Sequence, residues 1–329
     1  MALGEFDRID RFFAPLSRGA PGALGLTDDA ALLPVAAVGS VWVVTVDALV
    51  EGVHFLQDDP PDLVARKAIR VNLSDLAAMG AAPYGYTLAL ALPSDMKEPE
   101  SWLDGFARGL RLDQETYGIH LLGGDSVSTP GPVTLSVTAF GTVPPDRALR
   151  RSRACPGDDL WVSGTIGDSA FGLRVLTSED GPLVDTGEAF LADRYRLPQP
   201  RVTLGPALVG IASAALDVSD GLVQDAGHIA RRSGVAVRIE WARVPLSGPV
   251  ARRIAATPAL RLDALTGGDD YELLFTAPVE NRSRVVEAAS AAGETVTRIG
   301  RIEAGKGVDV LDPDGCVVEG LARGGWSHF

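Results

Sequence analysis

Acidic residues recur at the ends of apolar runs in this chain, and their spacing predicts metal chemistry. In LDVSDGLVQD (216–225), Asp217 and Asp220 lie between an apolar run and a helix-like segment. An ionised carboxylate beside a core is costly unless a cation, a donor or water compensates it. The same placement recurs at Asp28 and Asp29, Asp47, Asp75, Asp125, and Asp269 and Asp270. Because Mg²⁺ takes oxygen ligands, we expect these carboxylates to gather around hard cations.

A structural interpretation of each acidic residue stands beside this one. Ser219 or Asp220 could cap the helix that follows, as Ser and Asp commonly do. Asp75, taken alone, could lie on the solvated face of a helix. His54, His120 and His228 are each consistent with a structural role. These alternatives stay open when each residue is considered by itself.

The overall charge and composition exclude several classes of protein. A net charge of −13 argues against a nucleic-acid partner, since phosphate backbones require a basic surface. No apolar stretch approaches the roughly 18–20 residues that span a bilayer. The N-terminus MALGEFDRIDRFF has no signal-peptide core, and two cysteines make neither a disulfide framework nor a zinc site. We therefore expect a cytoplasmic protein with no membrane partner.

Phosphate chemistry, if present, must proceed without the usual lysines. Lysine occurs only at Lys67, Lys97 and Lys306, and no G-x-x-x-x-G-K-[ST] motif exists. GxGxxG, HExxH and GxSxG are missing as well. Metal ions, arginines and backbone amides would have to neutralise a phosphorylated substrate.

Hydrophobic periodicity predicts an α/β fold in two domains. The first half predicts strands at 41–47, 84–92, 119–122 and 133–141, with helices at 62–79 and 99–117. The second half alternates strands with helices at 167–176, 200–214, 221–233 and 280–292, and 177–199 is predicted to be a linker or loop. The Pro- and charge-rich segment 144–159 marks the boundary. We expect an N-terminal domain at 1–148, with a mixed sheet, and a C-terminal α/β domain at 149–329.

Several motifs occur in an order that resembles a known family. They are TDDAALL, VTVDALVEGVHF, VNLSDLAAMGAAP, LLGGDS, RSRACPGDDLWVSGTIGDSA, LDVSDGLVQDAGHI, LTGGDDYELLF and the terminal GGWSHF. Together they resemble the thiamine-monophosphate kinase family, within the superfamily of aminoimidazole ribonucleotide synthetase and selenophosphate synthetase. The resemblance runs from Gly4 to Phe329. VNLSDLAAMGA and SDGLVQDAGHI, in register with VEGVHF, are its most specific parts.

The resemblance implies a reaction and a set of site residues. It implies direct phosphoryl transfer from ATP to thiamine monophosphate, with several Mg²⁺ ions, no catalytic side chain, and a homodimer that pairs N-terminal sheets. The implied metal positions are Asp29, Thr45, Val46 (through its backbone only), Asp47, Asp75, Asp125, Asp217 and Asp220. The implied ATP positions are Gly124, Asp125, Arg151 and Ser219, and the thiamine end falls to His54, Asp269 and Trp326.

Two positions depart from the family pattern, and two other functions remain to be distinguished. Thr27 replaces the second glycine of the first acidic motif, and Asp269 replaces the glutamate of GGEDYEL. One alternative is a superfamily enzyme with another substrate; selenophosphate synthetase is disfavoured because no cysteine precedes the first acidic motif. The other is a metal-binding or interaction protein without turnover.

Overall fold

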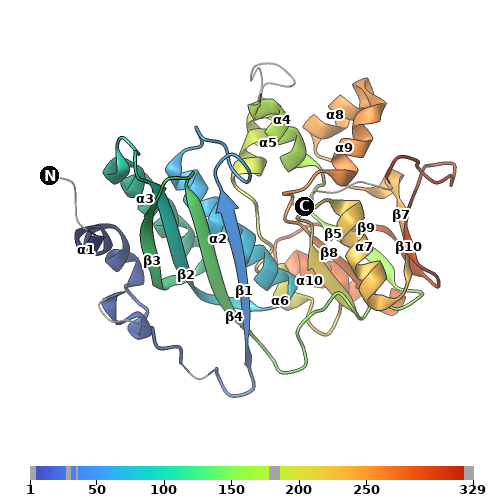
Figure 1. Cartoon of the computed structure of the whole chain (residues 1–329). Coiled ribbons are helices and arrows are strands. Elements are labelled where there is room, and N and C mark those ends of the chain that lie inside the picture. The colour runs from blue at the N-terminus through green and yellow to red at the C-terminus, as the bar shows by residue number, and fades with distance from the viewer. Residues whose placement is uncertain (1–4, 27–30, 35, 178–185, 322–329) are drawn as a thin grey trace. The chain divides into compact units, whose positions relative to one another are not determined.

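The chain divides into two units, and the computed structural model describes residues 5–26, 31–34, 36–177 and 186–321. The N-terminal unit comprises residues 1–76 and 81–145, and the C-terminal unit comprises residues 77–80 and 146–329. Each unit has its own sheet (Figure 1). No helix in the described ranges is both long and apolar enough to cross a membrane.

The N-terminal unit is built on a mixed four-stranded sheet in the order β1-β4-β2-β3. Its strands are β1 (Val41–Val50), β2 (Ala82–Pro93), β3 (His120–Thr129) and β4 (Thr134–Val143). The β1–β4 and β2–β4 pairs are antiparallel, whereas β2 and β3 run parallel. Helices α2 (Pro61–Ala78) and α3 (Pro99–Tyr117) cover one face of this sheet (Figure 1).

Alternation along the strands decides which sheet face is buried. Leu135 and Val137 of β4 are 0% and 1% exposed, and Leu76 of α2 and Phe106 of α3 are fully buried as well. Val44 and Val46, which alternate with the buried positions of β1, are 57% and 60% exposed. The second face of the sheet is therefore apolar and open over these positions.

Short helical segments precede β1; the first of them pack against α3 at the β3 edge of the sheet, and the last reaches the second face. They are α1 (Glu5–Arg8) and the turns η1 (Ile9–Phe13), η2 (Ala14–Ser17) and η3 (Pro21–Leu26). Ala20 and Ala23 form a small apolar cluster with Leu122 of β3 and the half-buried Phe140 of β4.

Two charged contacts fix α2 against α3. Asp113 of α3 is fully buried and accepts hydrogen bonds from Arg70 Nε at 2.7 Å and Arg66 Nε at 2.9 Å, both from α2. Gly109 allows the close approach, because a Cβ there would lie 2.2 Å from the carbonyl oxygen of Asp62. The position of α2 matters because this helix carries Asp75.

The C-terminal unit has a six-stranded mixed sheet in the order β10-β7-β9-β5-β8-β6. Its strands are β5 (Asp159–Ser163), β6 (Ala214–Asp217), β7 (Ala236–Glu240), β8 (Leu273–Ala277), β9 (Val296–Glu303) and β10 (Gly307–Leu311). Its helices are α4 (Asp168–Leu176), α5 (Thr186–Arg196), α6 (Leu204–Ala207), α7 (Leu222–Ser233), α8 (Gly248–Ala256), α9 (Arg261–Thr266) and α10 (Arg282–Ala291), with the turns η4 (Trp241–Arg243), η5 (Pro258–Leu260) and η6 (Val279–Asn281).

Both faces of this second sheet are buried. Leu160 and Val162 of β5 belong to a core that includes Ile229 of α7. Trp161, between them in sequence, belongs to a second core that includes Val285 of α10. Successive residues of β5 thus enter opposite cores, as in a sheet covered by helices on both sides.

The predicted α/β class and the mixed N-terminal sheet are confirmed, but two element predictions are wrong. Residues 200–214 were expected to be one helix, yet only α6 forms, because Pro206 cannot donate to an extended helix and Gly210 adopts a left-handed φ of +78°. Residues 177–199 were expected to be a loop, yet α5 occupies much of this range. Burial of Leu191 and Tyr195, 0% and 4% exposed, stabilises that helix.

Candidate functional site

Thr45, Asp47 and Asp75 come together in the N-terminal unit. Thr45 and Asp47 alternate on β1 and so point to the sheet face that α2 covers. Thr45 Oγ1 donates a hydrogen bond to Asp75 Oδ2. The backbone N–H of Asp47 donates to Asn72 Oδ1 at 3.1 Å. Asn72 and Asp75 are three residues apart on one face of α2, so a single helix supplies both contacts.

The charge on Asp47 is poorly compensated by the protein itself. Burial and, to a smaller extent, the nearby Asp75 carboxylate together raise the pKa of the Asp47 carboxyl to about 7. Two carboxylates and a hydroxyl are oxygen donors of the kind that Mg²⁺ prefers. These oxygen donors suit Mg²⁺, and their uncompensated negative charge favours a bound cation. Both features fit the Mg²⁺ ions that the family resemblance implies.

Asp125 and Gly124 occupy a different part of the same sheet. The register aligns Asp47 with Val137, Leu88 and Gly124, whereas Asp125 aligns with Ala89, Ser136 and Ala48. Since neighbouring registers face opposite sides, the Asp125 side chain lies on the open face, away from Asp47. Val46 also lies on that face. Within this unit the predicted metal positions therefore divide between two faces.

Gly124 is required by the packing of the strands. A Cβ at this position would lie 2.0 Å from the carbonyl oxygen of Leu88 on β2. This close approach provides a structural reason for the glycine in addition to the implied contact with ATP.

His54 is fixed in the turn that follows β1. The backbone N–H of Val50 donates to His54 Nδ1 at 3.0 Å, so Nε2 carries the proton in the neutral ring. The buried Lys67 of α2 donates to the His54 carbonyl oxygen at 2.8 Å. The histidine therefore has a defined ring orientation.

Asp217, Ser219 and Asp220 form the end of β6 and the loop before α7. Asp217 closes the strand and is 3% exposed. Neither Ser219 nor Asp220 caps the helix, because Gly221 is its N-cap and no side-chain cap hydrogen bond forms. The capping interpretation of these two residues is therefore wrong, and Asp220 Oδ2 instead accepts a hydrogen bond from Gln224 Nε2 of α7 at 3.0 Å.

Asp225 and His228 extend this cluster, although sequence reasoning missed the first and treated the second as structural. Asp225 Oδ2 accepts the backbone N–H of Asp220 at 3.0 Å. Ligand atoms of Asp220, Asp225 and His228 lie within 4.8 Å of one another, the one group of three or more potential ligands found in the described ranges. The spacing of three residues between Asp225 and His228 on α7 was the available signal.

Arg151 lies close enough to this cluster to act on its charges. The pKa of Asp225 is raised to about 7, chiefly by burial. The hydrogen bond from the Asp220 backbone acts to lower it, the Asp220 carboxylate to raise it, and the Arg151 guanidinium to lower it. Burial and then Arg151 lower the pKa of His228. The structure thus brings the predicted ATP contacts Arg151 and Ser219 to the same loop region as Asp220.

The segment 267–272 lies beside the same loop. The backbone N–H of Asp269 donates to the Ser219 carbonyl oxygen at 2.8 Å, and that of Tyr271 donates to Val218 at the same distance. A Cβ at Gly268 would lie 2.3 Å from the Ser219 carbonyl oxygen. Asp269 is therefore fixed next to the predicted metal and ATP residues of this unit.

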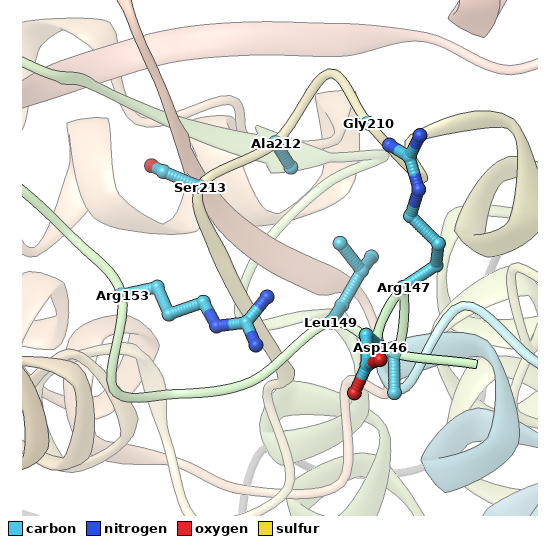
Figure 2. A pocket seen from close by; sticks show the side chains of 8 residues that line it. Asp146, Arg147, Leu149, Arg153, Gly210, Ala212 and Ser213 are labelled. Carbon is cyan, nitrogen blue, oxygen red and sulfur yellow. The ribbon is translucent and has the colours of Figure 1, made fainter. Parts of the chain in front are cut away.

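Two predicted positions lie outside the described residues: Asp29 and Trp326. A cavity of about 260 Å³ in the C-terminal unit contains no predicted site residue. Arg147, Leu149, Arg153 and Gly210 are among its lining residues (Figure 2). Both arginines lie in the segment 144–159 that is predicted to mark the domain boundary, and Arg151 between them does not line the cavity.

Comparison with known proteins gives the family. The N-terminal domain of AIR synthase related proteins matches residues 27–143, and their C-terminal domain matches residues 155–312. Thiamine-monophosphate kinase of Caulobacter vibrioides is 45% identical and covers 98% of this chain and 90% of its own length. The chain belongs to the thiamine-monophosphate kinase family.

Solved structures agree with this assignment. The crystal structure of thiamine-monophosphate kinase from Stenotrophomonas maltophilia has a TM-score of 0.84 and 43% identity, covering 97% of this chain and 99% of that chain. AaThiL complexed with AMPPCP and TMP has a TM-score of 0.78 and 35% identity, covering 100% and 99%. The two-domain fold implied by the family resemblance is confirmed.

The raised pKa of the Asp47 carboxyl predicts how pH and Mg²⁺ affect the stability of the protein. The carboxyl's folded pKa of about 7 exceeds the ordinary aspartate value of 3.8, so the metal-free protein loses stability as pH rises between these values, and the full loss of stability is present above pH 7. Allowing for partial solvent exposure, we expect Asp47→Asn to raise the free energy of unfolding of the metal-free protein at pH 8 by about 1–3 kcal/mol. Mg²⁺ should raise the thermal midpoint of the wild type more at pH 8 than at pH 6, and the variant should lose most of that increase.

Thermal unfolding with and without Mg²⁺ measures both effects. Asp104→Asn removes an exposed carboxylate of α3 and is the matched control, expected to behave like the wild type. An equal Mg²⁺ effect in the wild type and Asp47→Asn would contradict cation binding at Asp47.

Proposed function

We propose that this thiamine-monophosphate kinase family member transfers the γ-phosphoryl group of ATP directly to the phosphate of thiamine monophosphate. The observation that carries the proposal is that family membership coincides with clustered acidic residues in this chain: Asp47 and Asp75 form a half-buried acidic pair in one unit. Asp217, Ser219, Asp220, Arg151 and Asp269 gather around one loop in the other. AaThiL, the 35% identical relative, was solved with AMPPCP and TMP.

Charge neutralisation is the main task for this reaction. Donor and acceptor both carry phosphates, and phosphoryl transfer depends on in-line positioning and electrostatic stabilisation more than on covalent chemistry. Bound Mg²⁺ would supply positive charge between the two anions. Within the N-terminal unit, Thr45, Asp47 and Asp75 would hold one such ion, and Asp125 and the Val46 backbone, on the other face of the sheet, would contribute to a further one. Within the C-terminal unit, Asp217 and Asp220 would hold another, and we propose Asp29 as an additional ligand.

The remaining side chains bind and orient the two substrates. Arg151 offers a guanidinium that can pair with a phosphate through two hydrogen bonds, and Gly124 and Ser219 complete the ATP contacts. His54, Asp269 and Trp326 hold the thiamine end, where an aromatic face favours a cationic ring. The carboxylates act as metal ligands, so transfer proceeds without a phosphorylated enzyme and without a catalytic side chain.

A coupled assay of ADP release tests this reaction. ADP should appear with thiamine monophosphate as acceptor and require Mg²⁺, and Asp47→Asn and Asp220→Asn should each lower kcat by about 100-fold or more. Asp104→Asn should keep wild-type kcat. Faster ADP release with free thiamine than with thiamine monophosphate would indicate another kinase reaction. No ADP release with any acceptor would favour a binding protein without turnover.

We further propose that the protein works in the cytoplasm as a homodimer that pairs the open faces of two N-terminal sheets. Val44, Val46 and Val127 are each more than half exposed on that face. Exposed apolar patches of this kind commonly mark protein interfaces, and a two-fold interface covers the same patch on both copies.

Light scattering tests the assembly. The wild type should have the mass of two chains at micromolar concentration, and Val44→Glu should shift it toward a monomer by burying a charge in the interface. Val286→Glu is the control, because Val286 of α10 is 54% exposed, close to the 57% of Val44. A monomeric wild type, or a dimer that Val44→Glu leaves intact, would contradict pairing through this face.

A further inference from the structure

The backbone of segment 267–272 is strained at two residues that carry side chains. Asp269 and Tyr271 have φ angles of +68° and +51°. A left-handed conformation is uncommon for any residue with a Cβ and is an outlier for a bulky one such as tyrosine. Such conformations persist where the surrounding structure determines them, and they cluster at functional sites.

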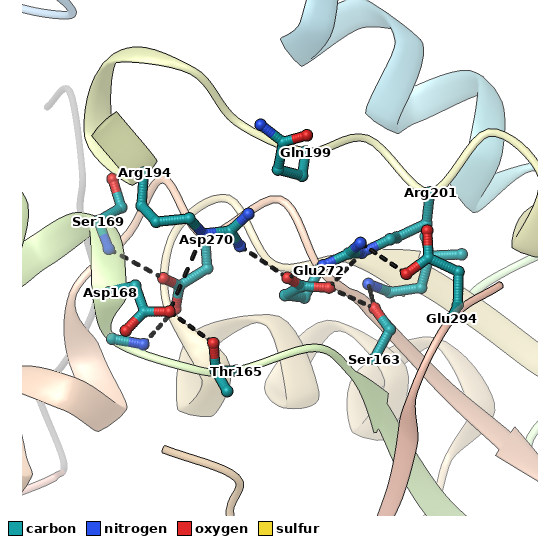
Figure 3. A network of polar contacts seen from close by, with 12 residues as sticks. Ser163, Thr165, Asp168, Ser169, Arg194, Gln199, Arg201, Asp270, Glu272 and Glu294 are labelled. Atoms are coloured by element: carbon teal, nitrogen blue, oxygen red, sulfur yellow. Dashed lines mark hydrogen bonds and ion pairs between the residues drawn. The ribbon is translucent and has the colours of Figure 1, made fainter. Parts of the chain in front are cut away.

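Two buried carboxylates anchor the strained segment from the inside. Asp270 is 2% exposed and accepts the backbone N–H of Gly167 at 2.7 Å and that of Ser169 at 3.3 Å, at the start of α4 (Figure 3). Glu272 is fully buried and accepts hydrogen bonds from Arg194 Nη2 at 2.7 Å and from Arg201 Nε at 2.6 Å.

A hydroxyl completes the anchor at Glu272. Ser163 Oγ of β5 donates to Glu272 Oε2 at 2.6 Å and also accepts the backbone N–H of Leu273. The inward carboxylates are thus bound by groups from α4, α5 and β5 and from the segment that follows α5. These contacts, with the two backbone hydrogen bonds to the 218–219 loop, determine the conformation of the segment.

Alternation along the segment sends the other two side chains outward. Asp269 and Tyr271 are half-buried, whereas Asp270 and Glu272 are buried. The Tyr271 hydroxyl donates to Asp269 Oδ1 at 3.4 Å. A phenol ring and a carboxylate are therefore held side by side, next to the loop of Ser219 and Asp220.

We propose that Tyr271 is a specificity-determining residue for the phosphoryl acceptor, acting as a preorganised pair with Asp269. The pair recognises the organic end of the acceptor: the phenol face attracts the positive charge of the thiazolium ring, and the carboxylate, oriented by the phenol hydroxyl, accepts hydrogen bonds from the amino group of the pyrimidine ring. The strained backbone sets both side chains before the acceptor arrives, so less ordering is needed on binding. This inference rests on the proposed function, because it concerns the acceptor of that reaction.

Substitutions at Tyr271 separate the ring, the hydroxyl and the strain. Tyr271→Phe keeps the ring and should raise KM for thiamine monophosphate about 3-fold, since one modest hydrogen bond is lost. Tyr271→Ala should raise it about 10-fold or more, with KM for ATP within about 2-fold of wild type, because ring contacts belong to the acceptor alone. Tyr84→Phe, a half-buried tyrosine of the other unit, is the control and should leave both KM values unchanged.

The strain is tested by comparing Tyr271→Gly with Tyr271→Ala. Both variants lack the ring, but only glycine adopts a positive φ without steric cost. Tyr271→Gly should therefore have the higher thermal midpoint. Equal midpoints, or a higher one for Tyr271→Ala, would contradict the strained conformation.

Direct binding of thiamine monophosphate by calorimetry distinguishes failure of this inference from failure of the proposed function. Weaker binding to Tyr271→Ala than to Tyr84→Phe supports the role of Tyr271 even if turnover uses another acceptor. Equal affinity in wild type and Tyr271→Ala, or an equal rise in KM for ATP and acceptor, would overturn it. No binding to the wild type would overturn both.

Discussion

Negative charge beside an apolar core is the constraint on which both units depend. The protein compensates its buried carboxylates in two ways. Glu272 is bound by two arginines, which compensate its charge internally. Asp270 accepts two backbone N–H groups, although burial still raises its pKa well above the ordinary value. Asp47 differs, because the charge that acts on it most strongly is another carboxylate, Asp75. Glu272 and Asp270 therefore position the site, whereas Asp47 favours binding of a cation.

This distinction explains why similar sequence motifs serve in different local structures. LSDL at 73–76 and VSDG at 218–221 share a Ser-Asp pair. In the structure, Asp75 lies inside α2 and meets β1 through Thr45, whereas Asp220 lies in a loop and is fixed by Asp225. Each unit thus presents its carboxylates by a separate device. In the N-terminal unit, strand β1 and helix α2 position the carboxylates. In the C-terminal unit, a glycine-containing loop before α7 positions them.

The sequence predicted the long elements and many of the site residues, and its failures have physical causes. Helix α3 matches its predicted range of 99–117, because the Pro at its start and Gly118 at its end are strong local signals. The missed helix α8 had signals too, since Ser247 caps it by accepting the Val250 N–H and Pro249 follows. Helix α5 depends on tertiary burial of Leu191 and Tyr195, which no local pattern shows.

The site shows the same limits. Asp47, Asp75, Asp217 and Asp220 could be found because each interrupts an apolar run. Asp225 was missed although its spacing to His228 on α7 offered a signal, and its hydrogen bond to the Asp220 backbone is seen only in the structure. Tyr271 could not be assigned, since its role comes from a left-handed φ. That Asp47 and Asp125 point to opposite faces could not be predicted without the strand register, which is set by pairing across the whole sheet.

Metal rescue at Asp47 tests the central claim most directly, namely that its carboxylate binds a divalent cation during phosphoryl transfer. Asp47→Cys replaces a hard oxygen ligand with a thiolate, which prefers softer metals. With Mg²⁺ the variant should release ADP at a rate at least about 100-fold below wild type, and Cd²⁺ should restore a substantial part of that rate. Asp47→Ala, which offers no ligand, should not respond to Cd²⁺. Wild-type turnover of both variants with Mg²⁺, or an equal response of both to Cd²⁺, would contradict metal binding by Asp47.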